Sequence, residues 1–322
     1  MIERRDFLRL CGAGALALVL PGDSRSAAAG KPLRGIFPIA QTPFTSAGAL
    51  DVDALAEQVR FLDRGGVHGC VWPQLASEWA TLKREERQAG AEAITATGKK
   101  LKPAIVIGVQ AEDAEAAVRY ARHAEKAGAD AVIALPPPKQ SDPKVLLDYY
   151  RRIGAATPLP LFAQAVGSMS VDLLVELWQT VPTLRYVKDE AGQPLLRIAP
   201  LRERTKGELK IFTGGHGKTL IDEMRRGFEG TMPAASFADL YAGAWDRWHA
   251  GQTAEAMEIF ARAAVLINEI SAFGLESMKY ILVQRGVFKT YSVREAQHDH
   301  LDEEGKKVLR ELLDFARPYL KA

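Results

Sequence analysis

The sequence has little cysteine and no excess of charge of either sign. Its 322 residues include two cysteines, Cys11 and Cys70, and 42 basic against 40 acidic residues, for a formal charge of +2. No long block of like charge occurs, so nothing in the sequence calls for nucleic acid or an anionic membrane surface as a partner. One or two cysteines cannot build a disulfide framework or a thiolate metal site. A small neutral or anionic molecule is the expected ligand, and we predict no metal site.

The apolar run near the start of the chain is too short to cross a bilayer, so it does not fit a membrane anchor. The run from Cys11 to Leu20 has ten residues, whereas a spanning helix needs about 20. It follows Arg4-Arg5-Asp6-Phe7-Leu8 and precedes small residues at 26–30, which is the order of an export signal. The paired arginines resemble the twin-arginine motif. We therefore predict a signal peptide over residues 1–29, cut after Ala28 or Ala29, and a periplasmic mature protein without stable membrane insertion.

From residue 34 onward, short apolar segments alternate with amphipathic ones. Such alternation is typical of a parallel sheet built from βαβ units. The amphipathic segments have helical periodicity, as at Leu55, Val59 and Leu62, with Asp51 as an N-cap. Eight strands within about 220 residues favour a closed (β/α)8 (TIM) barrel of the α/β class over an open sheet. The predicted strands lie at residues 35–40, 68–72, 103–108, 131–135, 160–163, 184–187, 209–212 and 230–232.

Beyond residue 250 the sequence predicts helices alone. Their apolar faces need a partner, and no linker rich in proline, glycine or serine precedes them, so we expect them to pack on the barrel. The predicted organisation is a barrel over 30–250 and a C-terminal helical extension over 251–322. The predicted helices lie at 253–270, at 275–285, in a short segment after Ser292, and at 303–319.

Lys188 directly follows the apolar strand predicted at 184–187. In a barrel, the carboxyl ends of the strands open onto one shared mouth, where working groups lie. A lysine in that position reaches solvent, pairs with an acid, or loses its proton because burial disfavours the charge. A neutral amine is a nucleophile toward a carbonyl carbon. From position alone, an ion pair with Asp189 or Glu190 is the simpler interpretation.

Four short motifs occur together in one order along the chain. Together they resemble the dihydrodipicolinate synthase/N-acetylneuraminate lyase family from about residue 34 to 290. The resemblance implies that Lys188 forms an imine with pyruvate or a related 2-oxo acid, in an aldolase or dehydratase that needs no metal or organic cofactor. It also implies a homo-oligomer, a tetramer or dimer. The motifs are Thr42-Pro43-Phe44, Leu82 with Glu85-Glu86-Arg87, residues 124–131 leading to Pro136-Pro137, and Val187-Lys188-Asp189 followed by Gly192.

The chain departs from that family at three places. Where the family has a Gly-Thr-Thr-Gly-Glu loop that holds the carboxylate of the 2-oxo acid, this chain has residues 74–78, Gln-Leu-Ala-Ser-Glu, and both hydroxyls are missing. Where the family closes its fifth strand with Tyr-Asn, this chain has Gln164-Ala165, and an amide cannot shuttle a proton near neutral pH. An arginine of some members falls on Met169. Candidate replacements for the acid-base relay are Glu190, His216 and Glu78, although Glu78 fits a structural hydrogen-bond acceptor better.

The predicted site combines Lys188 with residues near other strand ends. His216 lies in a glycine-rich loop over 213–217, where a merely solvated histidine is an equal alternative. Large apolar residues near the strand ends predict an apolar mouth, although a packed barrel rim would look the same. Those apolar residues are Trp72, Trp79, Phe162 and Met169. The predicted substrate-binding residues are Ala76, Ser77, Gln164, Gly214, His216 and Met232.

Two further patterns carry no site prediction. Gly217-Lys218-Thr219 resembles the end of a phosphate-binding loop, but Phe212 stands where that pattern needs a glycine. His298-Asp299-His300 lacks cysteine and the helical spacing of metal-binding histidines, so a solvated turn is the better interpretation.

Three functions remain open at this point. The first is a Schiff-base lyase. The second is a barrel that binds a small 2-oxo acid or sugar acid without turnover, since the relay is missing. The third, an unrelated phosphate-binding barrel enzyme, rests only on the glycine loop near residue 214. We favour the lyase, because a buried lysine is costly to keep without a use.

Overall fold

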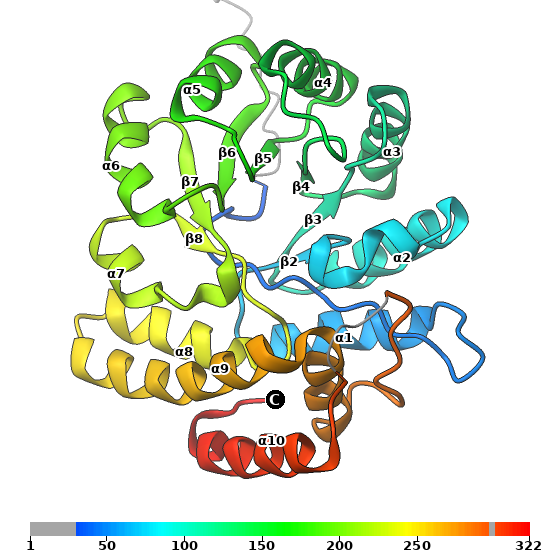
Figure 1. Cartoon of the computed structure of the whole chain (residues 1–322), viewed down its shortest axis with the longest axis vertical. Helices are drawn as coiled ribbons and strands as arrows, with labels where there is room; N and C mark the ends of the chain where they lie inside the picture. The colour runs from blue at the N-terminus through cyan, green and yellow to red at the C-terminus, as the bar shows by residue number, and fades with distance from the viewer. Residues whose placement is uncertain (1–29, 296–299) are drawn as a thin grey trace, which may run out of the picture. The chain divides into compact units, whose positions relative to one another are not determined.

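Eight parallel strands alternate with helices in the computed structural model, which describes residues 30–295 and 300–322 (Figure 1). The sheet order is β1-β8-β7-β6-β5-β4-β3-β2, so strands β2 to β8 pair in chain order and β1 pairs with β8. This confirms the predicted (β/α)8 barrel. The strands are β1 (Gly35–Ile36), β2 (Gly69–Trp72), β3 (Ala104–Gly108), β4 (Ala131–Ala134), β5 (Leu161–Ala165), β6 (Leu184–Asp189), β7 (Lys210–Thr213) and β8 (Gly230–Thr231).

The barrel closes through isolated bridges between its first and second strands. Ile39 bridges both Val71 on β2 and Ala234 beyond β8. The backbone N–H of Ala40 donates to Val71 O at 2.9 Å, and that of Val71 donates to Pro38 O at 3.0 Å. The strand predicted over 35–40 is therefore interrupted. Pro38 has no N–H to donate, which breaks the ladder at that point.

The helices that cover the barrel begin and end where the sequence provides caps. Asp51 Oδ1 accepts from Ala54 N, and Ser170 Oγ accepts from Leu173 N at the next predicted cap. Gly128 ends its helix in the left-handed conformation, with φ of 88°. These helices are α1 (Val52–Arg64), α2 (Arg84–Gly98), α3 (Ala114–Ala127), α4 (Pro143–Ala156), α5 (Val171–Thr180), α6 (Pro194–Arg204), α7 (Leu220–Arg225) and α8 (Ala238–His249).

The interior of the barrel is filled by side chains. Phe162 stacks on Tyr186 with ring centroids 4.3 Å apart, and Phe37 packs edge-on against Phe212 at 5.2 Å. Phe37, Phe162 and Phe212 are fully buried. Because this core leaves no channel through the barrel, a ligand site has to lie at the mouth, where the strands end.

The C-terminal helices pack against the outside of the barrel, where α9 (Thr253–Gln284) runs beside α8 and α10 (Glu303–Ala316) lies on α9 (Figure 1). The helix α9 is broken at Gly274, with φ of 57° and ψ of −135°, between the two helices that the sequence predicts. Described residues 292–295 form no helix, and the remainder of the short predicted helix falls on residues 296–299, outside the described residues.

Residues 31–322 form one compact unit. The predicted signal peptide, residues 1–29, lies outside the described residues. Within the described ranges, every helix is too short or too polar to cross a membrane.

Candidate active site

Lys188 lies near the carboxyl end of β6 and faces the mouth of the barrel. Its side chain is 6% exposed, and its Nζ lies 2.9 Å from Glu190 Oε2. The same side chain lines a cavity of about 430 Å³. Both interpretations of Lys188 are therefore compatible. It forms an ion pair with Glu190, and it also borders a space large enough for a small ligand.

Glu190 receives three hydrogen-bond donors on its two carboxylate oxygens. Besides Lys188, Gln164 Nε2 donates to Oε2 at 2.5 Å, and the backbone N–H of Gly215 donates to Oε1 at 2.9 Å. Burial acts to raise the pKa of Glu190, but the Lys188 charge and these donors outweigh it and lower the pKa below 4.5. Glu190 is therefore a carboxylate near neutral pH, at the edge of the cavity.

Asp189, which lies between Lys188 and Glu190 in the sequence, pairs with an arginine and not with the lysine. Its Oδ2 accepts from Arg197 Nε at 2.7 Å, and Arg197 Nη2 donates to Met169 O at 2.8 Å. Burial raises the pKa of Asp189 in spite of this arginine. Arg197 thus links three segments: the end of β6 at Asp189, the loop after β5 at Met169, and the start of α6. Asp189 and Met169 therefore support the site without lining its cavity.

The loop after β7 comes close to the lysine because residue 214 is glycine. A Cβ at Gly214 would lie 1.9 Å from Glu190 Oε1 and 2.7 Å from Lys188 Cε. Two residues further, His216 has a left-handed φ of 60°, and Tyr241 Oη donates to its carbonyl at 2.6 Å. His216 lines the cavity, and burial lowers its pKa, so its ring is neutral at pH 7.

The loop after β2 forms the facing wall. Ala76 lines the cavity, but the Ser77 hydroxyl is turned to the backbone, where it donates to Ala40 O at 2.6 Å and accepts from Gln74 N at 3.0 Å. Gln74 also lines the cavity, and its amide nitrogen donates to Gln110 Oε1 at 2.9 Å. Of the two neighbours Ala76 and Ser77, only the alanine is in a position to contact a ligand.

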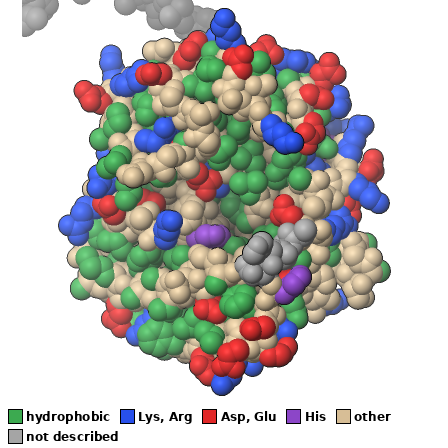
Figure 2. All heavy atoms as spheres, in the orientation of Figure 1, with side chains coloured by type: hydrophobic (Ala, Val, Ile, Leu, Met, Phe, Trp, Pro, Cys, Tyr) green, Lys and Arg blue, Asp and Glu red, His purple; other side chains and the backbone are tan. Residues whose placement is uncertain are grey.

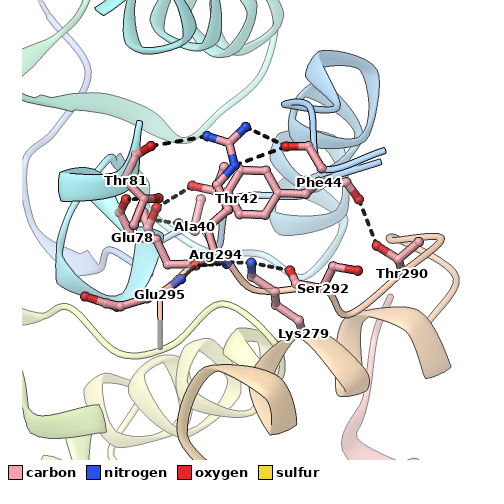
Figure 3. A network of polar contacts seen from close by, with 12 residues as sticks. Ala40, Thr42, Phe44, Glu78, Thr81, Lys279, Thr290, Ser292, Arg294 and Glu295 are labelled. Carbon is pink, nitrogen blue, oxygen red and sulfur yellow. Dashed lines mark hydrogen bonds and ion pairs between the residues drawn. The ribbon is translucent and has the colours of Figure 1, made fainter. Parts of the chain in front are cut away.

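A buried ion pair fixes this loop to the C-terminal segment (Figure 3). Glu78 Oε1 accepts from Lys279 Nζ, and both side chains are 0% exposed. Glu78 Oε2 accepts from the backbone N–H groups of Arg294 and Glu295 at 2.6 and 2.8 Å. The acceptor role expected for Glu78 is confirmed, and its oxygens are fully used in holding the rim.

Comparison with known proteins places this geometry in a family. The family model of the dihydrodipicolinate synthetase family matches residues 32–315. The chain belongs to this family. A 4-hydroxy-tetrahydrodipicolinate synthase of Rhizobium meliloti is 31% identical over 169 residues, which are 50% of this chain and 56% of that protein. The chain therefore spans little more than half the length of that curated relative.

Two other members of the dihydrodipicolinate synthetase family are matched over longer stretches. A protein of Escherichia coli named "Probable 2-dehydro-3-deoxy-D-pentonate aldolase" is 28% identical over 70% of this chain and 78% of its own length. The crystal structure of dihydrodipicolinate synthase from Rhodopseudomonas palustris superposes with a TM-score of 0.79 and 26% identity, and covers 87% of this chain and 97% of that one. By their names these relatives are lyases.

The predicted site residues other than Ser77, whose hydroxyl bonds to the backbone, fall into two groups. Lys188, Ala76, His216 and Met232 line the cavity. Gln164 and Gly214 lie behind it, in contact with Glu190. The described residues contain no group of three or more metal-ligating side chains, and His298 and Asp299 lie outside them.

Of the two interpretations of the large apolar residues near the strand ends, the structure supports packing over lining of the mouth. Trp72, Phe162 and Met169 are buried in the core, and Trp79 is absent from the cavity wall. The apolar wall is formed instead by segments far apart in the sequence. One of them is the part of α9 that follows the break at Gly274. A glycine inside a helical pattern was the available signal. The apolar lining residues that the sequence did not indicate are Ile39, Leu75, Pro233, Ala234, Leu275 and Met278.

Proposed function

We propose that this protein is a lyase in which Lys188 forms a Schiff base with pyruvate or a related 2-oxo acid, and then acts as an aldolase or a dehydratase. The observation that carries the proposal is the Lys188 amine at the cavity wall, 2.9 Å from the Glu190 carboxylate. The names of the family relatives support it. Ala76, His216 and Met232 would contact the substrate. Gln164 would hold Glu190 by a hydrogen bond, and Gly214 would leave room for its carboxylate.

The proposed reaction begins with a proton transfer from Lys188 to Glu190. The free amine adds to C2 of the 2-oxo acid, and the carbinolamine loses its hydroxyl as water with the proton that Glu190 returns. The protonated imine then acts as an electron sink, so Glu190 can accept a proton from C3 and leave an enamine. In the aldolase, C3 adds to an aldehyde whose oxygen takes the proton from Glu190. In the dehydratase, the enamine expels the C4 hydroxyl, which leaves as water with that proton. Water finally hydrolyses the imine and frees Lys188.

The ion pair itself opposes the first step, because a carboxylate at 2.9 Å stabilises the ammonium form. Glu190, however, keeps two donors that do not depend on Lys188, from Gln164 and Gly215. Its charge therefore remains compensated when the amine turns toward a ketone. In this way the Glu190 carboxylate can perform the proton transfers that the tyrosine performs in the family.

Glu190→Gln should slow imine formation with pyruvate by at least about 10²-fold, because glutamine keeps the size of glutamate and one accepting oxygen but cannot exchange a proton. The rate is measured by borohydride trapping over time and mass spectrometry. In the wild type, protonation of Glu190 should lower this rate only below pH 4.5, since its pKa is lowered from that value, and the variant should lack this acidic limb.

A matched control is Glu223→Gln, which changes another buried glutamate outside the cavity wall. Glu223 accepts hydrogen bonds from Thr213 at 2.7 Å and Thr219 at 2.6 Å. The control should trap pyruvate within about twofold of the wild-type rate, as expected for a residue outside the reaction. An equal loss in both variants would show that Glu190 acts through the fold and not through its proton.

A second candidate function is binding of a 2-oxo acid without turnover. The observation that favours it is the same ion pair, in which the Glu190 carboxylate lies 2.9 Å from Lys188 Nζ and competes with a ketone for the amine. This function predicts saturable thermal stabilisation by a 2-oxo acid with no borohydride adduct on Lys188. An adduct on Lys188 together with dehydration or cleavage of a carbon–carbon bond excludes it.

We further propose that the protein is exported by the twin-arginine route and works in the periplasm. The support is the order of Arg4-Arg5, the apolar run 11–20 and the small residues 26–30. Expression in a Gram-negative host should give a periplasmic protein whose N-terminus is Ala29 or Gly30. Replacement of both arginines by lysine should retain an uncleaved chain in the cytoplasm, and a cleaved periplasmic product of that variant would refute this route.

A further inference from the structure

The cavity beside Lys188 has two unlike ends. At the inner end lie the charged groups of Lys188 and Glu190, at the ends of the strands. The outer walls are formed by Leu75 of the loop after β2 on one side, and by Leu275 and Met278 of α9 on the other. A ligand bound to the lysine would extend its remaining atoms between these walls.

The outer walls offer almost no partner for a hydroxyl group. The described residues that line the cavity include no serine, threonine, tyrosine, asparagine or arginine. Gln74 donates its amide nitrogen to Gln110 Oε1, and its own Oε1 is buried with no hydrogen-bond partner among the described residues. Besides Lys188 and Glu190, the other polar side chains of the wall are His216 and Glu295. Hydroxyl groups that leave water without a partner cost free energy. A hydroxylated chain is therefore disfavoured between these walls.

The apolar groups on these walls are in turn open to a ligand. Leu75 is 54% exposed and lines the cavity. Met278 faces the same space, and methionine adapts readily to the shape of an apolar ligand. In Figure 2, hydrophobic side chains gather over the middle of the face, above the strands, while charged side chains lie mainly toward its edge.

We infer that the substrate is a 2-oxo acid with an apolar tail, an alkyl or aromatic group, and not a hydroxylated sugar acid. This inference rests on the proposed function, because Lys188 is taken to bind the 2-oxo group. The carboxylate and the ketone lie at the inner end, and the tail lies between Leu75, Leu275 and Met278. A cavity of about 430 Å³ is within the range that holds small ligands.

The test compares two 2-oxo acids with six carbons each, 2-oxohexanoate and 2-dehydro-3-deoxy-D-gluconate. Borohydride trapping on Lys188 gives the concentration of each acid that half-saturates the protein, whether or not turnover follows. We expect a value at least about tenfold lower for 2-oxohexanoate, because its tail loses water contact at no cost in hydrogen bonds. 4-Phenyl-2-oxobutanoate should behave like 2-oxohexanoate.

Two exposed leucines provide a matched pair of variants that both leave the core intact. Leu75→Asn should reduce the preference for the alkyl acid to about threefold or less, because a polar group then faces the tail. Leu196→Asn, at a residue that is 63% exposed and lines a different cavity, should leave the preference unchanged. A preference that disappears in Leu196→Asn instead would place the tail in the neighbouring cavity and overturn the inference.

The outcomes separate this inference from the proposed function. If pyruvate is trapped on Lys188 but the hydroxylated acid binds as well as the alkyl acid or better, the apolar tail is refuted and the Schiff-base function stands. Trapping of pyruvate without either six-carbon acid refutes the tail as well. If no 2-oxo acid is trapped, the proposed function fails, and the inference fails with it.

Discussion

Lys188→Arg should abolish the borohydride-dependent adduct with 2-oxo acids and lower any lyase activity by about 10⁴-fold or more, as expected when a catalytic nucleophile is removed. Arginine stays protonated under all ordinary conditions and forms no imine, but it can keep an ion pair with Glu190. The substitution therefore separates chemistry at this position from charge pairing. Mass spectrometry after trapping and a steady-state assay measure the two effects.

The outcome of this substitution decides between the two proposed functions. If Lys188 serves only to pair with Glu190, the arginine variant keeps saturable binding of a 2-oxo acid and loses little affinity. The control is Lys218→Met, which removes an exposed lysine from the loop after β7, outside the wall that Lys188 lines. It should keep the adduct on Lys188. An adduct that moves to another lysine in Lys188→Arg would contradict the assignment of this amine.

The barrel could be predicted from the sequence because its signals are local. Each strand is a short apolar run, and caps such as Asp51, Ser170 and Gly128 mark helix ends, whatever the rest of the chain does. An error occurs where backbone chemistry intervenes, because Pro38 interrupts the first strand. The break at Gly274, by contrast, falls between the two helices that the sequence predicts.

The site was predictable only where a strand end alone determines it. Lys188 follows from its position on β6 and from the motif around it, and Glu190 was one of several candidates. The apolar walls were not predictable, because Leu75, Leu275 and Met278 meet through the packing of α9 on the barrel, which no local pattern encodes. Phe162 is not a mouth residue for a different reason: it packs against Tyr186 and Phe212 in the barrel interior, where it is fully buried.

Lys279→Met should destabilise the protein by about 3–5 kcal/mol, the usual effect of removing one partner of a fully buried ion pair. Glu78 and Lys279 are both 0% exposed, so the loss of the ammonium group leaves the Glu78 carboxylate without its buried cation. Burial already lowers the pKa of Lys279 in spite of Glu78, which shows how strongly this site disfavours an uncompensated charge. Denaturant unfolding with a linear extrapolation measures the change.

The double variant Glu78→Gln/Lys279→Met tests whether the charge itself is the cause. It removes both charges while its glutamine can still accept from the backbone N–H groups of Arg294 and Glu295, so it should recover much of the stability lost in the single variant. Lys307→Met, in a pair that is 57% and 75% exposed with Glu304, should change stability little. If Lys279→Met is as stable as this control, the pair does not hold the rim.

Since Leu75 precedes Glu78 in the same loop, a single variant that loosens the rim should also weaken the preference for apolar 2-oxo acids, and the double variant should restore it.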